Sequence, residues 1–120
     1  MDVSGRHEEA GEYLMVAAAV HAEVGTNRIH SVLGMGLADR AAEPTLEATA
    51  GLVGEAVGRL PARPVGTVVA ERGEFYQEPA WSVEGHLDVE HEFKYVETIA
   101  ERETVQAAHH AAYAARKLLL

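Results

Sequence analysis

The most regular alternation of apolar and polar residues lies between Trp81 and Tyr95. Every even position in this stretch is polar. The apolar odd positions are Trp81, Val83, Leu87, Val89, Phe93 and Tyr95, with Gly85 and His91 between them. A period of two is typical of a strand with one buried face and one face in water. The pattern predicts an extended strand over 81–95, or two strands separated by a bulge at Gly85.

Apolar residues at helical spacing predict three helices, at 8–24, 44–60 and 97–120. The first helix is rich in alanine and stops at Gly25. Pro44 suits the first turn of the second helix, and Pro61 ends it. The third helix is also rich in alanine and reaches the last residue.

The remaining segments predict short strands. Residues 26–37 fit either period, but Gly34 and Gly36 weaken a helix, so we predict a strand there. Residues 65–70 predict a second strand, 71–73 a turn and 74–77 a returning strand. Together these elements predict one α+β domain over 1–120, with helices packed on one face of a small, mainly antiparallel sheet and a C-terminal helix. Residues 1–6 read as a polar lead-in and 118–120 as an apolar tail.

Composition narrows the classes of function. The chain has 120 residues, a net charge of −9 and no cysteine. Without cysteine there are no disulfides, thiolate nucleophiles or cysteine-bound zinc. The net negative charge argues against binding to a phosphate backbone, and the longest apolar run, Leu14–Val20, is too short to cross a membrane. We therefore expect a cytoplasmic protein without membrane or specific nucleic-acid partners. The preference for arginine over lysine and the many alanines indicate a GC-rich genome.

The negative charge is unevenly distributed. Residues 71–103 carry 10 acidic and 3 basic side chains, whereas 104–120 carry Arg116 and Lys117 and no acid. On the predicted strand the excess forms an acidic face of Glu84, Asp88, Glu90 and Glu92. Such a face attracts basic partners and repels DNA, or it serves solubility alone.

The same strand face offers metal ligands. His86, Asp88 and Glu90 project from one side of the predicted strand, and carboxylates with imidazole suit divalent cations. The alternative interpretation is a solvated strand face without a ligand. The chain contains no P-loop, nucleophile elbow, dinucleotide-binding glycine motif or zinc-protease motif. We expect no cofactor and no enzymatic activity.

Two further groups of residues are candidates for binding. Trp81, His91, Tyr95 and Tyr113 could line a pocket between sheet and helices, because His91 falls in the apolar register of the predicted strand. His91 is equally compatible with a core histidine held by one hydrogen bond. The three terminal leucines, Leu118, Leu119 and Leu120, predict self-association or docking on this domain.

Residues 19–32, AVHAEVGTNRIHSV, resemble the helix-to-strand segment of tailed-phage neck or tail-completion proteins. Glu23 stands where that family has proline, and Asn27 where it has glycine. The resemblance implies a small α+β subunit that forms a ring between capsid and tail, and it implies no catalytic residue. The resulting prediction is a structural subunit of a phage or prophage virion that assembles into an oligomer. The alternative is a small-molecule-binding protein or minor enzyme of a GC-rich bacterium.

Overall fold

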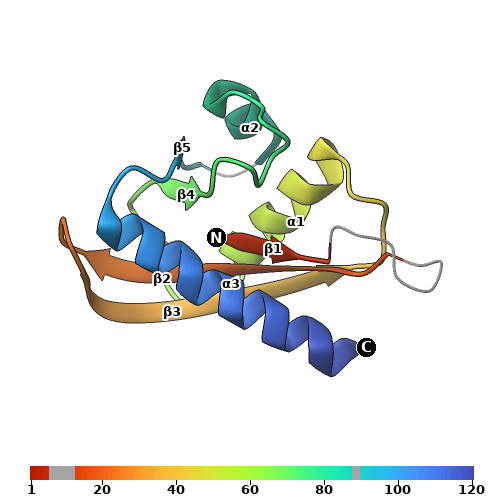
Figure 1. Ribbon diagram of the computed structural model, residues 1–120, viewed down its shortest axis with the longest axis horizontal. Helices are drawn as coiled ribbons and strands as arrows, with labels where there is room; N and C mark the ends of the chain where they lie inside the picture. The colour runs from red at the N-terminus through yellow and green to blue at the C-terminus, as the bar shows by residue number, and fades with distance from the viewer. Residues whose placement is uncertain (6–12, 88–89) are drawn as a thin grey trace.

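The computed structural model describes residues 1–5, 13–87 and 90–120. In chain order the elements are β1 (Asp2–Ser4), β2 (Met15–Val24), β3 (Ile29–Arg40), α1 (Leu46–Gly58), β4 (Val68–Ala70), α2 (Ala80–Leu87), β5 (Phe93–Tyr95) and α3 (Ile99–Leu119). The mixed α+β class and the C-terminal helix are confirmed (Figure 1).

Two small sheets form the framework. Strands β1, β2 and β3 pair antiparallel in that order, and β4 pairs with β5 in parallel. The amino group of Met1 donates a hydrogen bond to the carbonyl oxygen of Val69 over 2.9 Å. This bond places β4 beside the start of β1, so that β1 is flanked by β2 and by the smaller sheet (Figure 1).

Helices cover both faces of the three-stranded sheet. On one face Met15, Ala17 and Ala19 of β2 belong to the same buried cluster as Leu52, Val53 and Ala56 of α1. On the other face Ala18 packs with Ala108 and Ala112 of α3, and α3 runs along the sheet in Figure 1. The alanines of β2 let both helices lie close to the central strand.

Burial on both faces explains why the predicted helix at 8–24 is wrong. Residues 15–24 form β2, and residues 8–12 lie outside the described part of the chain. A strand covered on both faces needs apolar residues at every position, so its alternation disappears. Pairing with β1 on one side and β3 on the other then outweighs the helix propensity of alanine.

Three other predicted elements are confirmed. The strand predicted at 26–37 is β3, the helix predicted at 44–60 is α1, and the helix predicted at 97–120 is α3. Thr45 caps α1 by accepting a hydrogen bond from the amide of Ala48. Thr98 and Glu101 form a capping box at the start of α3.

The long alternating strand at 81–95 is wrong, because its first half is α2 and, of its described residues, only Phe93–Tyr95 form a strand. Val83 and Leu87 are four residues apart, so they fit the spacing of a buried helical face as well as that of a strand. Both are buried, whereas Trp81, which would share their face in a strand, is 79% exposed.

Two shorter predictions are also wrong. The returning strand at 74–77 is a turn in which Tyr76 and Gln77 have φ of 57° and 65°, a conformation that a strand does not contain. The polar lead-in at 1–6 contains β1, and Met1, Asp2 and Val3 are buried. Residue 6 lies outside the described residues.

The strand predicted at 65–70 is confirmed as β4, although it is only Val68–Ala70.

Among the described residues, no helix combines the length and the apolar character that crossing a membrane would require.

Candidate functional site

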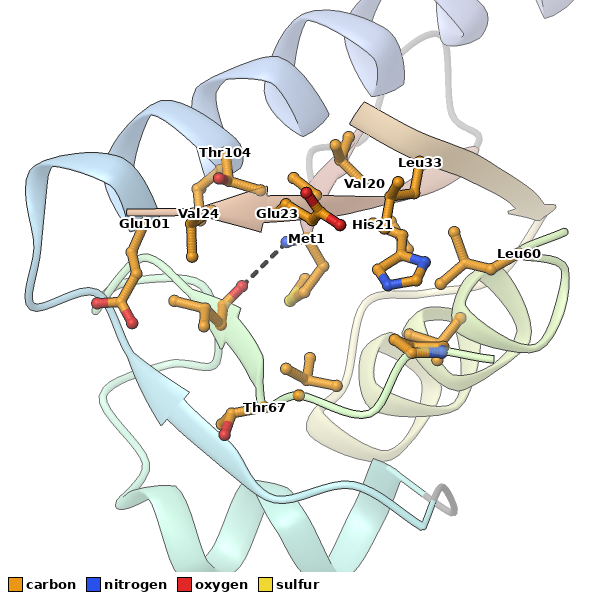
Figure 2. Close-up of a pocket in the computed structure, with 18 of the residues that line it drawn as sticks. Met1, Val20, His21, Glu23, Val24, Leu33, Leu60, Thr67, Glu101 and Thr104 are labelled. Carbon is orange, nitrogen blue, oxygen red and sulfur yellow. Dashed lines mark hydrogen bonds between the residues drawn. The ribbon is translucent and has the colours of Figure 1, made fainter. Parts of the chain in front are cut away.

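A cavity of 480 Å³ lies where the second half of β2 extends beyond the end of α1. Its lining comes from β2, β3, α1, β4, α3 and the 64–67 loop (Figure 2). Helix α1 ends at Gly58, and Pro61, which lies against Gly34 of β3, prevents the helix from continuing. The face of β2 that α1 covers at Ala17 and Ala19 is therefore open at His21 and beyond.

Most of the cavity wall is apolar. Its apolar side chains include Ala19 and Val24 of β2, Leu33 of β3, Val57 and Leu60 at the end of α1, Val68 of β4 and Val105 of α3. Apart from His21, the polar side chains lie toward the rim, with Thr67 and Thr104 on opposite sides in Figure 2. An apolar cavity with a few polar groups is typical of small-molecule sites.

His21 is the polar group within this apolar wall. Its ring points into the cavity between Leu33 and Leu60 (Figure 2). The Nδ1 atom is buried and has no hydrogen-bond partner among the described residues. Buried polar atoms in folded proteins are nearly always hydrogen-bonded, because leaving one unpaired costs about 1–3 kcal/mol. His21 therefore carries an unpaired polar atom at the wall of the cavity, and a hydrogen bond from a bound molecule would remove this cost.

An ion pair closes one side of the rim. Lys94 Nζ of β5 lies 2.6 Å from Glu101 Oε2 of α3, and this hydrogen bond raises the pKa of Lys94. Burial acts to raise the pKa of Glu101, but the bonds from Lys94 and from the amides of Glu97 and Thr98 outweigh it and lower that pKa. Lys94 and Glu101 therefore neutralise each other, and Glu101 also accepts hydrogen bonds from amides at the start of α3.

The amino group of Met1 lies at the inner wall, where Figure 2 shows its bond to the strand below. Burial lowers the pKa of this amino group to about 6, although the carboxylates of Asp2 and Glu74 act in the opposite direction. At neutral pH the group is mainly uncharged. The interior of the cavity thus has polar atoms but little net charge.

The four residues predicted to line one pocket are not brought together. Trp81 and His91 line a shallow hollow with Glu84, Glu90 and Glu92. Tyr95 donates a hydrogen bond to the carbonyl oxygen of Glu78 and lines a different hollow. Tyr113 lies on α3, stacked on His109, whose Nδ1 is 3.1 Å from Oδ2 of the buried Asp2.

The predicted acidic face does not exist as a strand face. Glu84 belongs to α2 and accepts a hydrogen bond from the amide of Phe93, while Glu90 pairs with Arg63 and Glu92 precedes β5. Asp88 lies outside the described residues.

The metal ligands predicted from the same pattern have other partners. His86 of α2 has its Nδ1 2.8 Å from the carbonyl oxygen of Ser82, and Glu90 pairs with Arg63. Within residues 1–5, 13–87 and 90–120, no group of three or more histidine, aspartate or glutamate side chains is placed to hold a metal ion. The terminal residues Leu118, Leu119 and Leu120 are exposed at the end of α3.

Sequence reasoning missed His21 because it treated residues 8–24 as a helix. Once residues 15–24 are a strand, His21 shares a face with Ala17 and Ala19. The useful signal is an isolated histidine within an otherwise apolar stretch, but it can be read only after the strand is recognised.

Comparison with known families adds one result. A family model described as "Uncharacterized protein conserved in archaea (DUF2209)" matches residues 1–120. The chain belongs to this family. Membership in DUF2209 contradicts the resemblance to tailed-phage neck proteins, so the predicted virion subunit between capsid and tail is wrong. The archaeal family also points away from a bacterial source. No curated protein and no solved structure matches the chain.

Proposed function

We propose that this protein binds a small, uncharged and mainly apolar molecule in the cavity beneath β2, and that His21 recognises one hydroxyl-type group on it. The proposal rests on the buried Nδ1 of His21, which has no hydrogen-bond partner among the described residues. His21 lines an apolar cavity of 480 Å³. That volume falls within the range of roughly 300–1,000 Å³ found for small-molecule sites.

The charges around the cavity favour an uncharged ligand. Lys94 is engaged by Glu101, so it offers little to an anion. Glu23 is exposed at the rim and would repel an anion further. A hydroxyl is the simplest matching group, because it can donate to or accept from an imidazole nitrogen in either tautomer.

The test is a fluorescence titration with 2-naphthol, with naphthalene as the matched probe that lacks the hydroxyl. We expect His21→Phe to weaken 2-naphthol binding about five- to tenfold, the equivalent of one hydrogen bond of about 1 kcal/mol. Naphthalene binding should change less than about twofold, because phenylalanine preserves the apolar wall.

A second variant tests the position of the site. Thr67 is exposed at the rim, so Thr67→Trp should narrow the entrance without disturbing the core, and both probes should bind more weakly. Val32→Lys, on the exposed apolar part of β3, is the control and should leave both affinities unchanged. The proposal fails if neither probe binds saturably, or if Val32→Lys abolishes binding while His21→Phe and Thr67→Trp retain it.

A cytoplasmic location is part of this proposal. It is supported by the acidic composition of the chain.

A further inference from the structure

Strand β3 is the outer strand of the three-stranded sheet and is unusually long for an edge. It spans Ile29–Arg40, pairs with β2 along one side, and has no described residue hydrogen-bonded as a strand along the other. Twelve residues extend over about 40 Å at about 3.3 Å per residue. The backbone of this edge therefore offers a long row of donors and acceptors to another strand.

The usual protection of an edge strand is weak here. Proteins protect such edges with charged side chains, prolines or short strands. Residues 29–38 contain no aspartate, glutamate, lysine, arginine or proline, although the chain as a whole has a net charge of −9. Two register irregularities, between Gly34 and Val32 and between Ser31 and Ile29, interrupt the pairing with β2, and the Arg59 side chain donates a hydrogen bond to the carbonyl oxygen of Leu37.

One face of β3 is also uncovered. Gly36 faces α1, since a Cβ atom there would meet the carbonyl oxygen of Ala56. Met35 and Leu37 therefore point to the opposite face, where α3 packs mainly over β1 and β2 (Figure 1). Val32, Met35 and Leu37 remain 56%, 44% and 39% exposed.

Opposite charges stand at the two ends of this apolar strip. Arg28 precedes β3, and Asp39 lies near its end; both are exposed, and neither has an ion pair with a described residue. The neighbouring Arg40 differs, because its guanidinium lies 3.3 Å from Glu55 Oε2. Arg28 and Asp39 are thus charged groups at opposite ends of an uncharged edge.

We propose that β3 is a self-association surface, on which two copies of this chain pair antiparallel to form a continuous six-stranded sheet. A two-fold axis brings the beginning of each β3 beside the end of the other. This arrangement places Arg28 of each copy near Asp39 of its partner. The dimer would therefore contain two Arg28–Asp39 ion pairs, one at each end of the paired strands. Val32, Met35 and Leu37 then lie in one continuous apolar strip.

We favour a second copy over an unrelated protein because the charges of β3 complement those of another β3. When the two strands run antiparallel, the positive end of each meets the negative end of the other. The cavity near His21 lies on the side of the sheet that faces α1. Self-association therefore does not depend on the proposed ligand, and the two proposals can fail separately.

Sedimentation velocity over a range of concentrations tests the dimer, with charge exchange as the decisive comparison. Arg28→Glu and Asp39→Arg should each raise the dissociation constant of the dimer about tenfold or more, and the double variant should restore it to within about threefold of the original. Glu103→Arg reverses an exposed charge on α3 and should leave the constant unchanged.

Two further variants separate this surface from the C-terminal leucines. Val32→Lys should yield a monomer whose circular dichroism matches that of the original chain, and whose thermal unfolding matches it at concentrations low enough for the original chain to be monomeric. Deletion of 118–120 should leave the dimer intact. Amide exchange of β3 should slow as the concentration rises. A monomer at every concentration overturns the proposal. So does a dimer that withstands Val32→Lys and both charge reversals, or one lost only when 118–120 are removed.

Discussion

Gly36 of β3 lies at the closest approach between the three-stranded sheet and α1. A Cβ atom at this position would lie 2.1 Å from the carbonyl oxygen of Ala56 and 3.2 Å from the amide nitrogen of Leu60. Both neighbours are backbone atoms, so no side chain can rotate to make room. Gly36→Ala therefore forces the end of α1 away from β3 by at least about 1 Å to reach an ordinary contact distance.

The cost of this displacement can be placed within limits. Forcing an extra methyl group into a well-packed contact costs about 1–3 kcal/mol. Replacing glycine also reduces the conformational freedom of the unfolded chain, which stabilises the folded state by less than about 1 kcal/mol. We expect a net loss of about 1–2 kcal/mol in the free energy of unfolding, a large share of the roughly 5–15 kcal/mol typical of a domain. Val57 and Leu60 should move with the helix end, so 2-naphthol binding should weaken as well.

Urea denaturation followed by circular dichroism measures the effect, and Gly58→Ala is the matched control. A Cβ atom at Gly58 meets nothing within 4 Å, and the residue ends α1. This control should be neutral or stabilised by up to about 1 kcal/mol, since alanine is the better helix former. Equal stability of Gly36→Ala and the original chain would refute the close packing of β3 on α1.

Three further substitutions test other contacts. The pKa of Glu101 lies below its ordinary value of 4.5, so its ionised form stabilises the folded state above pH 4.5, and this stability is lost as the pH falls through the lower value. In Glu101→Gln, the urea midpoint should therefore fall less steeply as the pH is lowered. Ala18→Leu should lower the free energy of unfolding by about 1–3 kcal/mol, because Ala18 is fully buried against α3, and an unchanged melting temperature would contradict that packing. Glu74→Ala should cost about 1–3 kcal/mol by removing the buried acceptor, 2.6 Å away, of the Val3 amide, whereas Glu74→Gln should retain most of the stability in the same thermal melts.

The elements that sequence reasoning recovered have local signals at their ends. Helix α1 begins after Thr45 and stops before Pro61, and α3 starts at the capping box of Thr98 and Glu101. Such caps act within one turn of the chain and can be read without knowledge of the tertiary structure.

The elements that it missed depend on the rest of the fold. Strand β2 looks helical until its two neighbouring strands and two covering helices are known, because only then does a run of alanines become a doubly covered strand. Helix α2 contains Val83 and Leu87 at a spacing compatible with either period. Local pattern alone could not decide these cases, since tertiary contacts override propensity.

The candidate site depends on the same missing information. His21 enters the cavity only because β2 is extended and α1 ends at Gly58. The polar residues predicted from the alternating pattern were assigned to one strand, whereas Glu84 and His86 lie on α2. The predicted strand face therefore does not exist, although Glu84, Glu90 and Glu92 still line one hollow.

The most direct test of the proposed binding site is the ¹⁵N signal of His21 Nδ1, measured by NMR during titration with 2-naphthol. If His21 recognises the hydroxyl, this signal should shift saturably, and naphthalene should leave it nearly unchanged. Saturable binding of 2-naphthol with no change at His21 Nδ1 would contradict the site proposed for this protein.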